Sequence, residues 1–382
     1  MRIRTITAGT FLRYNGMDEE IEEIGSFLKE AGERYEEEGT EVQTLRLATQ
    51  SFGTYQITGD EDSILDQISE MERIATRAGI DYLSVGSAFS PRFIKMIPHI
   101  IERTSTTCAS AWIGDEREGV NWSHVEEAAK AVKSISDIYP DGSGNFRFAS
   151  VSNVKPDTPF FPAAYHLDDP TTFSIGLESG DIANRALEIA DDISDIENTL
   201  LQDYWRECRT IQEIALTLPA EGFGYSGLDV SLCPSLDCDG SMANAISGIL
   251  GRDFGSRGTL SVCRSLTGVL DEIHVKRCGY CGLMLPVMED RGLAGCANQG
   301  KLSLERLLSY SSVCGTGLDM IPLPGNCSID DIKWVIGDVG TLSVKLDKPL
   351  SARLLPIPGS KEGDSTDIDS PHLVNCKVIP SG

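Results

Sequence analysis

The sequence predicts an α/β protein, because segments with helical periodicity alternate with short β-rich runs along almost the whole chain. Its 382 residues, 41% of them hydrophobic, are enough to build one large core. No Pro/Ser-rich linker, composition break or internal repeat divides the chain, so we expect residues 1–382 to form a single domain. Parallel strands joined by crossover helices imply either an open doubly wound sheet or a closed barrel.

The helices are recognised by apolar residues that recur every three or four positions. In residues 17–39 this stripe includes Ile21, Ile24 and Phe27, set among acidic residues. The same pattern predicts helices at residues 60–79, 91–103, 122–138, 241–250, 260–273, 302–311 and 329–342. The stretch 181–218 is also helical, but it is long for a compact domain, so we expect it to be broken or kinked.

Strands are expected where β-branched and apolar residues run between these helices. About ten are predicted, at residues 3–7, 42–48, 82–85, 106–112, 146–151, 173–177, 228–232, 282–285, 317–321 and 352–357. Gly222, Gly224 and Gly227 fit a GxGxxG pattern, but they precede a strand instead of opening a helix. We therefore interpret them as a turn and expect no NAD site. The chain has no GxxxxGKS or GxxxxGKT motif, so no ATP site of that type is expected.

The charge and hydropathy of the chain restrict its partners. With 33 Lys and Arg against 58 Asp and Glu, the net charge is −25, which repels phosphate backbones and anionic membrane surfaces. The apolar runs are too short to span a membrane, and the first residues lack the apolar core of a signal peptide, which predicts a cytoplasmic location. The expected partners are a small-molecule substrate and a second copy of the chain in a homodimer, with neither nucleic acid nor membrane.

The 11 cysteines have irregular spacing and do not form a secreted disulfide pattern. Cys278 and Cys281 make a lone CxxC motif, without the second pair or the histidines that a structural zinc site needs. We interpret them as ordinary thiols.

A Pro-rich loop, residues 153–166, is the first candidate site. It follows the strand predicted at 146–151 and ends in His166. The carboxyl end of a parallel strand is where α/β proteins place ligands. The alternative is a packing loop around a buried aromatic pair. In the same region Asn153 and Arg147 are candidate substrate-binding residues.

A second candidate loop, residues 312–325, places Cys314 in front of two closely spaced glycines and is followed by Asp319 within the same segment. A thiol whose pKa is lowered by backbone N–H groups or a cation is a nucleophile, and Asp319 would be an acid, a base or a metal ligand. The alternative is a tight turn around a buried thiol. Glu178, at the end of the strand predicted at 173–177, adds another carboxylate.

Three kinds of function remain open at this point. In a non-metal enzyme the catalytic side chains would be those of Cys314, Asp319, His166 and Glu178, while Arg353 and Lys361 would hold an anionic group of the substrate. In a metal-dependent enzyme a divalent ion would be ligated by His166, Glu178, Asp239 and Asp319. A non-catalytic ligand-binding protein is the third interpretation.

Six segments together resemble the DUF711 family, also called UPF0210: residues 4–9, 41–49, 145–166, 282–290, 313–325 and 348–359. The resemblance spans nearly the whole chain and implies no particular reaction. It implies a ten-stranded α/β barrel similar to those of pyruvate formate-lyase and the ribonucleotide reductases. Because enzymes with those barrels use a loop cysteine inside the barrel, Cys314 is the first cysteine to consider and Cys108 the second.

The C-terminus, HLVNCKVIPSG, lacks the glycyl-radical segment of some of those enzymes, so the resemblance does not carry over radical chemistry. We expect polar acid–base or thiol chemistry instead, as in a lyase, isomerase or hydrolase. The two candidate loops and Glu178 are expected to meet in one pocket, with His166 facing Cys314 or Asp319 across it.

Overall fold

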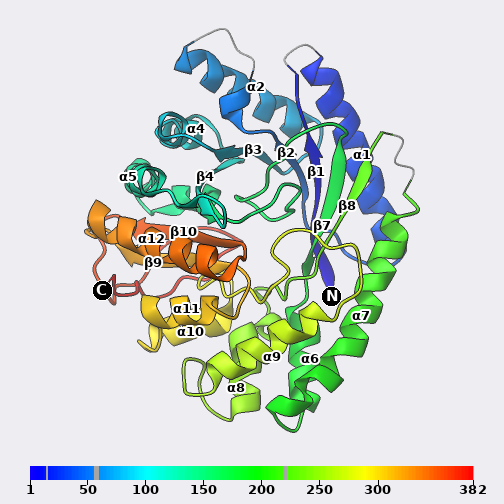
Figure 1. Cartoon of the computed structure of the whole chain (residues 1–382), viewed down its shortest axis with the longest axis vertical. Helices are drawn as coiled ribbons and strands as arrows, with labels where there is room; N and C mark the ends of the chain where they lie inside the picture. Colours follow the sequence, from blue (N-terminus) through cyan, green and yellow to red (C-terminus); the bar gives the residue numbers. More distant parts are fainter. Residues whose placement is uncertain (14–15, 56–59, 219–221, 382) are drawn as a thin grey trace.

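The computed structural model describes residues 1–13, 16–55, 60–218 and 222–381. Its centre is one mixed sheet of ten strands, in the order β8-β7-β1-β2-β3-β4-β6-β10-β9, with the short β5 (Gly119–Val120) paired to β4. Helices surround these strands at the periphery (Figure 1). The predicted α/β class is confirmed.

The first half of the chain forms five neighbouring parallel strands. They are β1 (Arg2–Thr10), β2 (Leu45–Thr49), β3 (Tyr82–Ala88), β4 (Thr107–Asp115) and β6 (Phe148–Ser152). The helices that connect them are α1 (Met17–Glu37), α2 (Glu61–Arg77), α3 (Pro91–Ile94), α4 (Ile97–Arg103) and α5 (Trp122–Ile138). In α1 the apolar stripe is buried, as its periodicity predicts. Asn121 begins α5 by accepting a hydrogen bond from the backbone N–H of His124.

The second half of the chain departs from the expected all-parallel arrangement. Strand β7 (Thr172–Glu178) pairs antiparallel with β1 and parallel with β8 (Gly224–Asp229). On the other side, β10 (Leu350–Ile357) pairs antiparallel with β6 and parallel with β9 (Gly317–Pro324). The sheet therefore contains two antiparallel junctions, which strand periodicity does not reveal because both pairings have a side-chain repeat of two.

Most of the remaining helices lie close to their predicted positions. The helical stretch 181–218 is broken, as expected, into α6 (Gly180–Ile189) and α7 (Ile196–Ala215). The others are α8 (Met242–Leu250), α9 (Thr259–Asp271), α10 (Arg291–Asn298), α11 (Leu304–Ser311) and α12 (Ile329–Leu346). Helix α10 was not predicted. The glycine pattern at 222–227 is not a turn as a whole, because β8 already begins at Gly224.

The ladder of strands does not close, since β8 and β9 are its two edges. The predicted strand at 282–285 is wrong, because these residues form only an isolated bridge to Leu232. Nevertheless residues 276–287 make backbone hydrogen bonds to both edges. On the β8 side Leu228 donates to Lys276 at 2.8 Å, and on the β9 side Val287 donates to Asp319 at 3.0 Å.

Glycines allow this segment to lie close to the start of β9. A Cβ atom at Gly282 would stand 2.1 Å from the Cα atom of Gly315, so neither position tolerates a side chain. The glycine in front of β9 is thus needed for contact between two backbones.

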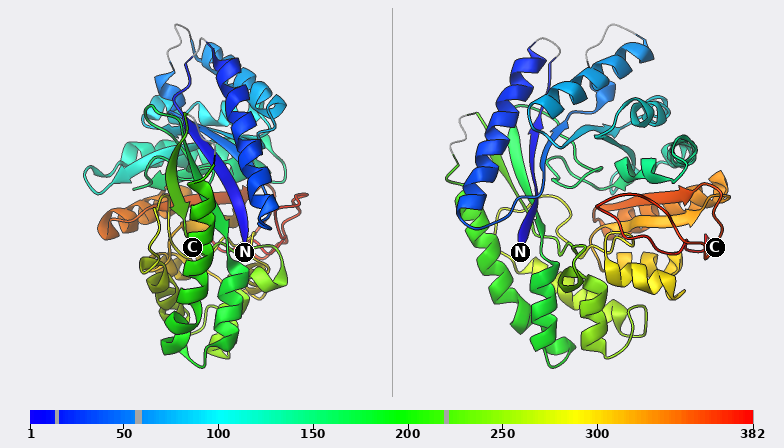
Figure 2. Two further views of the ribbon diagram at one scale, coloured as in Figure 1. Left: turned by 90° about the vertical axis from the view of Figure 1, so that its right-hand side faces the viewer. Right: turned by 180° about the vertical axis from the view of Figure 1, so that it is seen from behind.

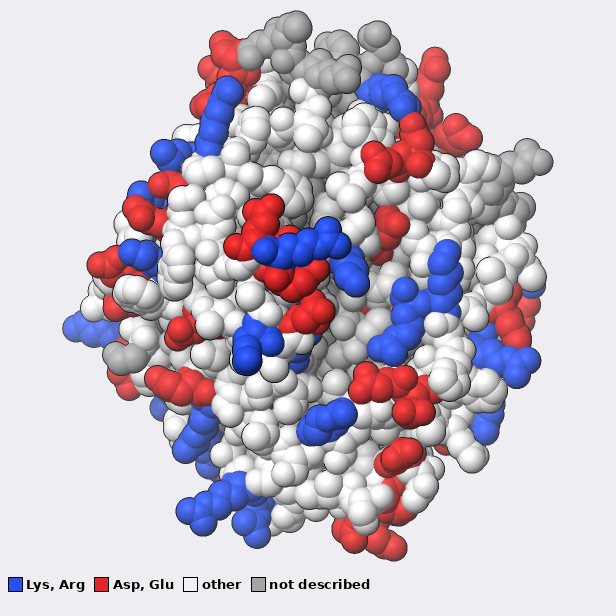
Figure 3. All heavy atoms as spheres, viewed as in Figure 1, with Lys and Arg blue, Asp and Glu red and all other residues white. Residues whose placement is uncertain are grey.

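The two ends of the chain lie beside different strands of the sheet. The N-terminal strand β1 is in the middle of the sheet, whereas the C-terminal segment runs beside β9 (Figure 2), where Ile379 donates to the carbonyl of Pro322. Within the described ranges, no helix is both long and apolar enough to cross a membrane. On the face seen in Figure 3, acidic and basic side chains are interspersed and not separated by sign.

Candidate functional site

A cavity of about 480 Å³ lies against one face of the sheet. Alternate residues of a strand point to the same face, so the strands present side chains to the cavity with a period of two. These side chains are Arg2 and Arg4 of β1, Arg46 of β2, Tyr82 of β3, Cys108 of β4, Ala149 of β6, Glu178 of β7, Asp319 of β9, and Ser351 and Arg353 of β10. Contributions from eight strands make this cavity the natural candidate site.

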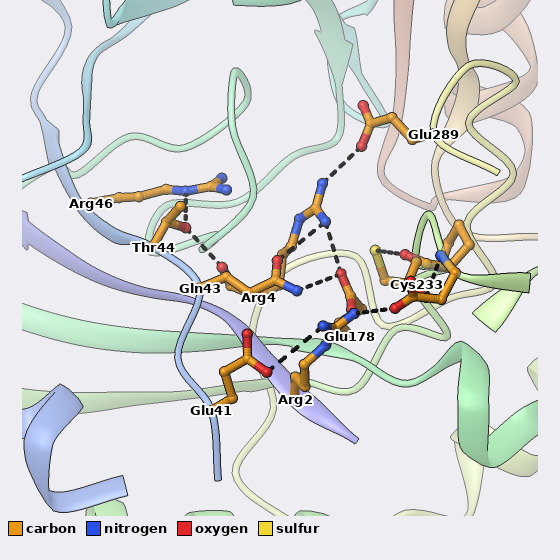
Figure 4. A network of polar contacts seen from close by, with 12 residues as sticks. Arg2, Arg4, Glu41, Gln43, Thr44, Arg46, Glu178, Cys233 and Glu289 are labelled. Carbon is orange, nitrogen blue, oxygen red and sulfur yellow. Dashed lines mark hydrogen bonds and ion pairs between the residues drawn. The ribbon is translucent and has the colours of Figure 1, made fainter. Parts of the chain in front are cut away.

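A continuous chain of ion pairs crosses the cavity wall from β9 to β7. Arg353 donates through Nε to Asp319 and through Nη2 to Glu289, both at 2.6 Å. Arg4 then joins Glu289, at 3.1 Å, to Glu178, at 2.8 Å (Figure 4). Each of these buried charges has a partner of opposite sign, which is the condition for tolerating them away from water.

The β7 end of this chain reaches the rim of the cavity. Glu178 also accepts hydrogen bonds from Arg2 Nε and Gln43 Nε2, both at 2.9 Å. Two exposed carboxylates, Glu41 and Asp237, contact Arg2 at 3.7 and 3.2 Å. These outer pairs are open to water, which weakens them relative to the inner ones.

Arg46 differs from the other arginines of the cavity. Its Nε donates to Thr44 Oγ1 at 2.9 Å, and its guanidinium lies over the rings of Tyr82 and Phe161, with centroid distances of 5.5 and 5.2 Å. No ion pair joins Arg46 to any carboxylate in the part of the chain that the structure describes. Arg46 is therefore a cation without a protein counter-ion there.

The pKa values of the three inner arginines follow these contacts. Burial disfavours a charged guanidinium, but Glu289 and Glu178 outweigh it at Arg4, and Asp319 with Glu289 outweighs it at Arg353, so that both pKa values are raised. At Arg46 burial, with the nearby Arg4, lowers the pKa to about 10. Because a guanidinium stays charged in proteins, this lowering marks an uncompensated positive charge.

Asp319 is the carboxyl group most changed in its acid–base behaviour at the cavity. Burial raises the pKa of Asp319; the ion pair with Arg353 opposes the rise and the neighbouring Glu289 adds to it, and the pKa stays above its ordinary value. Such a group takes up a proton more readily than an exposed aspartate. Perturbed carboxyl groups in cavities are typical of acid–base sites.

Two thiols also line the cavity, those of Cys108 and Cys233. Burial raises the pKa of Cys108 to about 11, although Arg147 and Arg46 act in the opposite direction. Burial likewise raises the pKa of Cys233. Both are therefore thiols at neutral pH and not thiolates, which are the nucleophilic form.

Several residues singled out from the sequence meet in this cavity. Glu178, Asp319 and Arg353 line it, as does Cys108, the second cysteine candidate. The loop 153–166 adds residues 160–163, and the segment 312–325 adds Thr316 besides Asp319. The two loops and Glu178 thus share one cavity, as the sequence predicts. The bound anionic group expected at Arg353 is less well supported, because its guanidinium already faces two carboxylates.

His166 does not lie among the residues that line the cavity. Its Nδ1 is 2.7 Å from Asp157 Oδ1, and its Nε2 contacts the carbonyl of Asp168. Asp157 also accepts hydrogen bonds from Thr172 at 3.0 Å and Ser226 at 2.9 Å. This cluster ties the loop to β7 and β8, so the expected meeting of His166 with Cys314 or Asp319 is not found.

Two predicted substrate-binding residues are held by the protein itself. Asn153 donates through Nδ2 to the carbonyl and the hydroxyl of Ser343, and its Oδ1 accepts from the backbone of Glu116. Arg147 is buried and donates to the carbonyls of Ile101 and Thr107, among other acceptors. Neither lines the cavity, because both are used in joining neighbouring elements.

The other predictions also differ from what the structure shows. Cys314 is only 1% exposed and packs in the core, where burial raises its pKa, and it does not line the cavity. Lys361 is exposed outside the cavity, with its backbone N–H bonded to Asp364. Asp239 is exposed beside a second hollow near Met1.

The four candidate metal ligands are consequently not brought together. Glu178 and Asp319 line the cavity, Glu178 shares the second hollow with Asp239, and His166 lines neither. In the described ranges, no group of three His, Cys, Asp or Glu side chains is placed to hold a metal ion.

Sequence reasoning missed several cavity residues: Arg4, Arg46, Cys233, Tyr280, Glu289, Thr316 and His372. A signal for some of them was present. Arg4 and Arg46 are charged residues inside runs that otherwise read as buried strands, and a charge at such a position is unusual unless it faces a polar interior. The remainder lie on irregular segments, whose direction no periodicity reports.

Fold and cavity together define a mixed α/β protein with a charged internal site. More specifically, the chain belongs to the family described as "Uncharacterised ACR (DUF711)", whose model matches residues 1–369. It is 26% identical over 364 residues to a UPF0210 protein of Oenococcus oeni, covering 91% of this chain and 81% of that protein. It is 27% identical over 403 residues to a UPF0210 protein of Ruminiclostridium cellulolyticum, covering 96% of this chain and 87% of that protein.

A third relative gives the same result. The UPF0210 protein MK1214 of Methanopyrus kandleri is 26% identical over 375 residues, which cover 92% of this chain and 82% of that protein. The family resemblance noted in the sequence is therefore confirmed.

Proposed function

We propose that this protein is an enzyme that acts on a small molecule by non-radical acid–base chemistry inside the cavity. The observation that carries the proposal is Asp319, a carboxyl group on the cavity wall whose pKa burial raises and whose orientation Arg353 fixes through a 2.6 Å hydrogen bond. A proton carrier works best when its pKa lies near the operating pH and its position is fixed.

Neighbouring groups support Asp319 in this role. Arg353 stabilises the carboxylate after it loses its proton, and Glu289 holds the other side of the Arg353 guanidinium. In the same wall Tyr280 donates to Ser351 Oγ at 3.2 Å and Ser351 donates to the carbonyl of Thr316 at 3.0 Å, so these two hydroxyl groups hold the wall beside Asp319 in place. A proton transfer of this kind fits a lyase or isomerase step, with hydrolysis as the third form.

Thiol catalysis is the weaker version of the proposal. Cys108 is the cysteine best situated for it, because it lines the cavity, but its pKa of about 11 keeps it protonated at neutral pH. We therefore assign the acid–base role to the carboxyl group.

We also propose that the domain is a closed ten-stranded barrel of the pyruvate formate-lyase type, with the cavity as its interior. The backbone hydrogen bonds of residues 276–287 to both β8 and β9 support this, since they span the gap between the two edges. The proposal includes a cytoplasmic homodimer that binds neither nucleic acid nor membranes.

The test compares the protein with its Asp319→Asn variant. Each is incubated with a small-molecule extract of cells, and the compounds consumed are followed by mass spectrometry. We expect a compound that the wild-type protein converts and the variant does not, while Asp330→Asn, at a carboxylate with an 80% exposed side chain, converts it normally. Conversion by Asp319→Asn at the wild-type rate, or no conversion by any form, contradicts the proposal; the second result favours a non-catalytic ligand-binding protein.

The same assay decides the metal-dependent alternative. Conversion that disappears with EDTA and returns with Mg²⁺ or Mn²⁺ would replace the metal-free mechanism by one in which Glu178 and Asp319, the two candidate ligands on the cavity wall, take part in binding the ion.

A further inference from the structure

The arginines of the cavity differ in how their charge is balanced. Arg2, Arg4 and Arg353 each contact at least two carboxylates, at distances between 2.5 and 3.7 Å. Among the described residues, Arg46 alone of these four has no such contact. A half-buried cation without a counter-ion is costly unless something else supplies the negative charge.

The guanidinium of Arg46 is nevertheless held in one orientation. Thr44 Oγ1 accepts from its Nε and itself donates to the backbone carbonyl of Arg4, at 2.7 Å. The rings of Tyr82 and Phe161 lie against it. Cation–π contacts of this kind contribute about 0.5–2 kcal/mol each, which fixes the group but does not neutralise it.

The two terminal nitrogens of this group remain available. The hydrogen bond to Thr44 uses Nε only, and Figure 4 shows no dashed line from the Nη atoms of Arg46 to the residues drawn. Parallel donors on a planar guanidinium match the spacing of oxygens in a carboxylate or phosphate group. An anion with two oxygens therefore fits this position geometrically.

A second, independent observation indicates a ligand in the same cavity. Thr316 lines the cavity and is only 3% exposed, yet its Oγ1 has no hydrogen-bond partner among the described residues. Buried hydroxyl groups are normally paired, because an unpaired one costs about 1–3 kcal/mol. Thr316 thus brings to the cavity wall a hydroxyl group that no described protein group uses.

We infer that Arg46 is the binding residue for an anionic group, a carboxylate or a phosphate, of the molecule on which the cavity acts. The inference rests on the proposed function for the identity of that molecule as a substrate, but not for the binding itself. The lowered pKa of Arg46, opposite in direction to those of Arg4 and Arg353, agrees with a missing counter-ion. In a chain with a net charge of −25, an anionic ligand needs such a local cation.

This assignment also changes the role of Arg353. The sequence makes Arg353 and Lys361 the anion-binding pair, but Arg353 is occupied by Asp319 and Glu289, and Lys361 lies outside the cavity. Arg353 thus positions the proton carrier, while Arg46 holds the substrate.

The experiment measures anion binding by the intact protein through its resistance to urea. A ligand that binds only the folded state raises its free energy of unfolding by RT ln(1 + [L]/Kd), so the increase at a given ligand concentration reports the affinity. The probes are inorganic phosphate and acetate, each titrated at constant ionic strength against chloride, with glycerol as a neutral control. The two anions distinguish a phosphate group from a carboxylate group.

The variants are Arg46→Met, Arg46→Lys and, as a charge-matched control, Arg117→Met, at a residue whose side chain is 86% exposed. Because phosphate stabilises most proteins slightly by exclusion from their surface, the informative quantity is the difference between variants. We expect at least one anion to bind the wild type and Arg117→Met with equal affinity. The same anion should bind Arg46→Met at least about tenfold more weakly, because this variant lacks the charge-assisted hydrogen bonds. The affinity of Arg46→Lys should lie between those of the wild type and Arg46→Met, since lysine keeps the positive charge but lacks the two parallel donors of a guanidinium.

Two results would overturn the inference. One is that neither anion raises the free energy of unfolding of the wild type more than it raises that of Arg46→Met. The other is saturable binding that survives in both Arg46 variants, which would put the anion elsewhere. Since the probe anions need not react, the two proposals fail separately. Anion binding that depends on Arg46, with no turnover by any form of the protein, would refute the proposed function alone. Turnover that depends on Asp319, with anion binding unchanged in both Arg46 variants, would refute the inference alone.

Discussion

The cavity wall and the loop 153–166 are both rich in polar side chains, yet the two regions differ in how those side chains are satisfied. In the loop region, Asn153 and His166 each use both polar atoms of their side chains on protein groups. In the cavity, the terminal nitrogens of Arg46 have no protein partner in the described chain, and the hydroxyl group of Thr316 has none either. The comparison teaches that binding capacity depends on unsatisfied groups and not on the number of polar residues.

The largest expected effect contrasts a paired with an unpaired arginine. Arg353→Met removes the partner of Asp319 and one partner of Glu289, and leaving buried carboxylates without their cation is expected to cost about 3–5 kcal/mol of stability. Arg46→Met leaves no carboxylate behind, and the loss of its two ring contacts is offset by removal of a cation without a counter-ion, so the free energy of unfolding should change by less than about 1 kcal/mol. Urea unfolding of the two variants measures the difference. Equal destabilisation by both would mean that Arg46 has a protein counter-ion.

The pH dependence of stability should have opposite signs in the two regions. The pKa of Asp319 is raised by burial, so its contribution is fully present below its ordinary value of 3.8 and is lost as the pH rises through its folded-state pKa. Burial would also raise the pKa of Asp157, but hydrogen bonding to His166 lowers it overall, so its contribution is present above 3.8 and is lost as the pH falls through its folded-state pKa.

Unfolding of the wild type against Asp319→Asn and Asp157→Asn, at a series of pH values, measures both signs. The wild type should lose stability relative to Asp319→Asn as the pH rises, with a slope of at most about 1.4 kcal/mol per pH unit. It should lose stability relative to Asp157→Asn as the pH falls. The same sign for both aspartates would refute the contrast between the regions.

Two cysteines allow a smaller test. Cys314 is buried in the core and Cys108 lines the cavity. Replacing either by Ala should destabilise the protein by about 1–2 kcal/mol, through the small void that the lost sulfur leaves. Only Cys108→Ala should alter binding of the probe anions, because it changes the cavity wall. Abolished turnover in Cys314→Ala, with the fold intact, would restore the catalytic role that the sequence gives to this thiol.

The smallest effect is expected for the CxxC motif. Cys278 and Cys281 are partly buried, and the Cys281 thiol donates to the carbonyls of Cys278, at 3.1 Å, and Leu228, at 4.0 Å. Changing both to Ser should lower stability by less than about 1 kcal/mol, since a hydroxyl group can make the same contact. Unfolding of the double variant together with loss of a stoichiometric zinc ion, measured by elemental analysis, would show that the motif is a structural metal site.

Much of the fold is predictable because helices and strands leave periodic patterns. The stripe of α1 and the break between α6 and α7 follow from the sequence. The antiparallel junctions at β7 and β10 do not, because strand direction leaves no trace in a period of two. Residues 282–285 have the composition of a strand, but they lie between the edge strands β8 and β9 and form only an isolated bridge.

The site is less predictable, because a polar residue looks the same in sequence whether or not a protein partner occupies it. Glu178 is selected for its place at a strand end and Asp319 for its place in the glycine-containing segment after Cys314, and both line the cavity. His166 was selected for the same reason, but Asp157, nine residues earlier, fixes it elsewhere. Arg46 stands out in the sequence as a charge inside a predicted strand, but its lack of a counter-ion is known only when all its neighbours are identified, which requires the folded chain.

A crystal structure of the protein soaked in phosphate or acetate would test the central claim most directly. We predict an anion in the cavity with two of its oxygens within hydrogen-bond distance of the Nη atoms of Arg46, while the pairs of Arg353 with Asp319 and Glu289 remain intact. An Arg46 guanidinium paired with a protein carboxylate, in a cavity where no anion approaches it, would contradict the account.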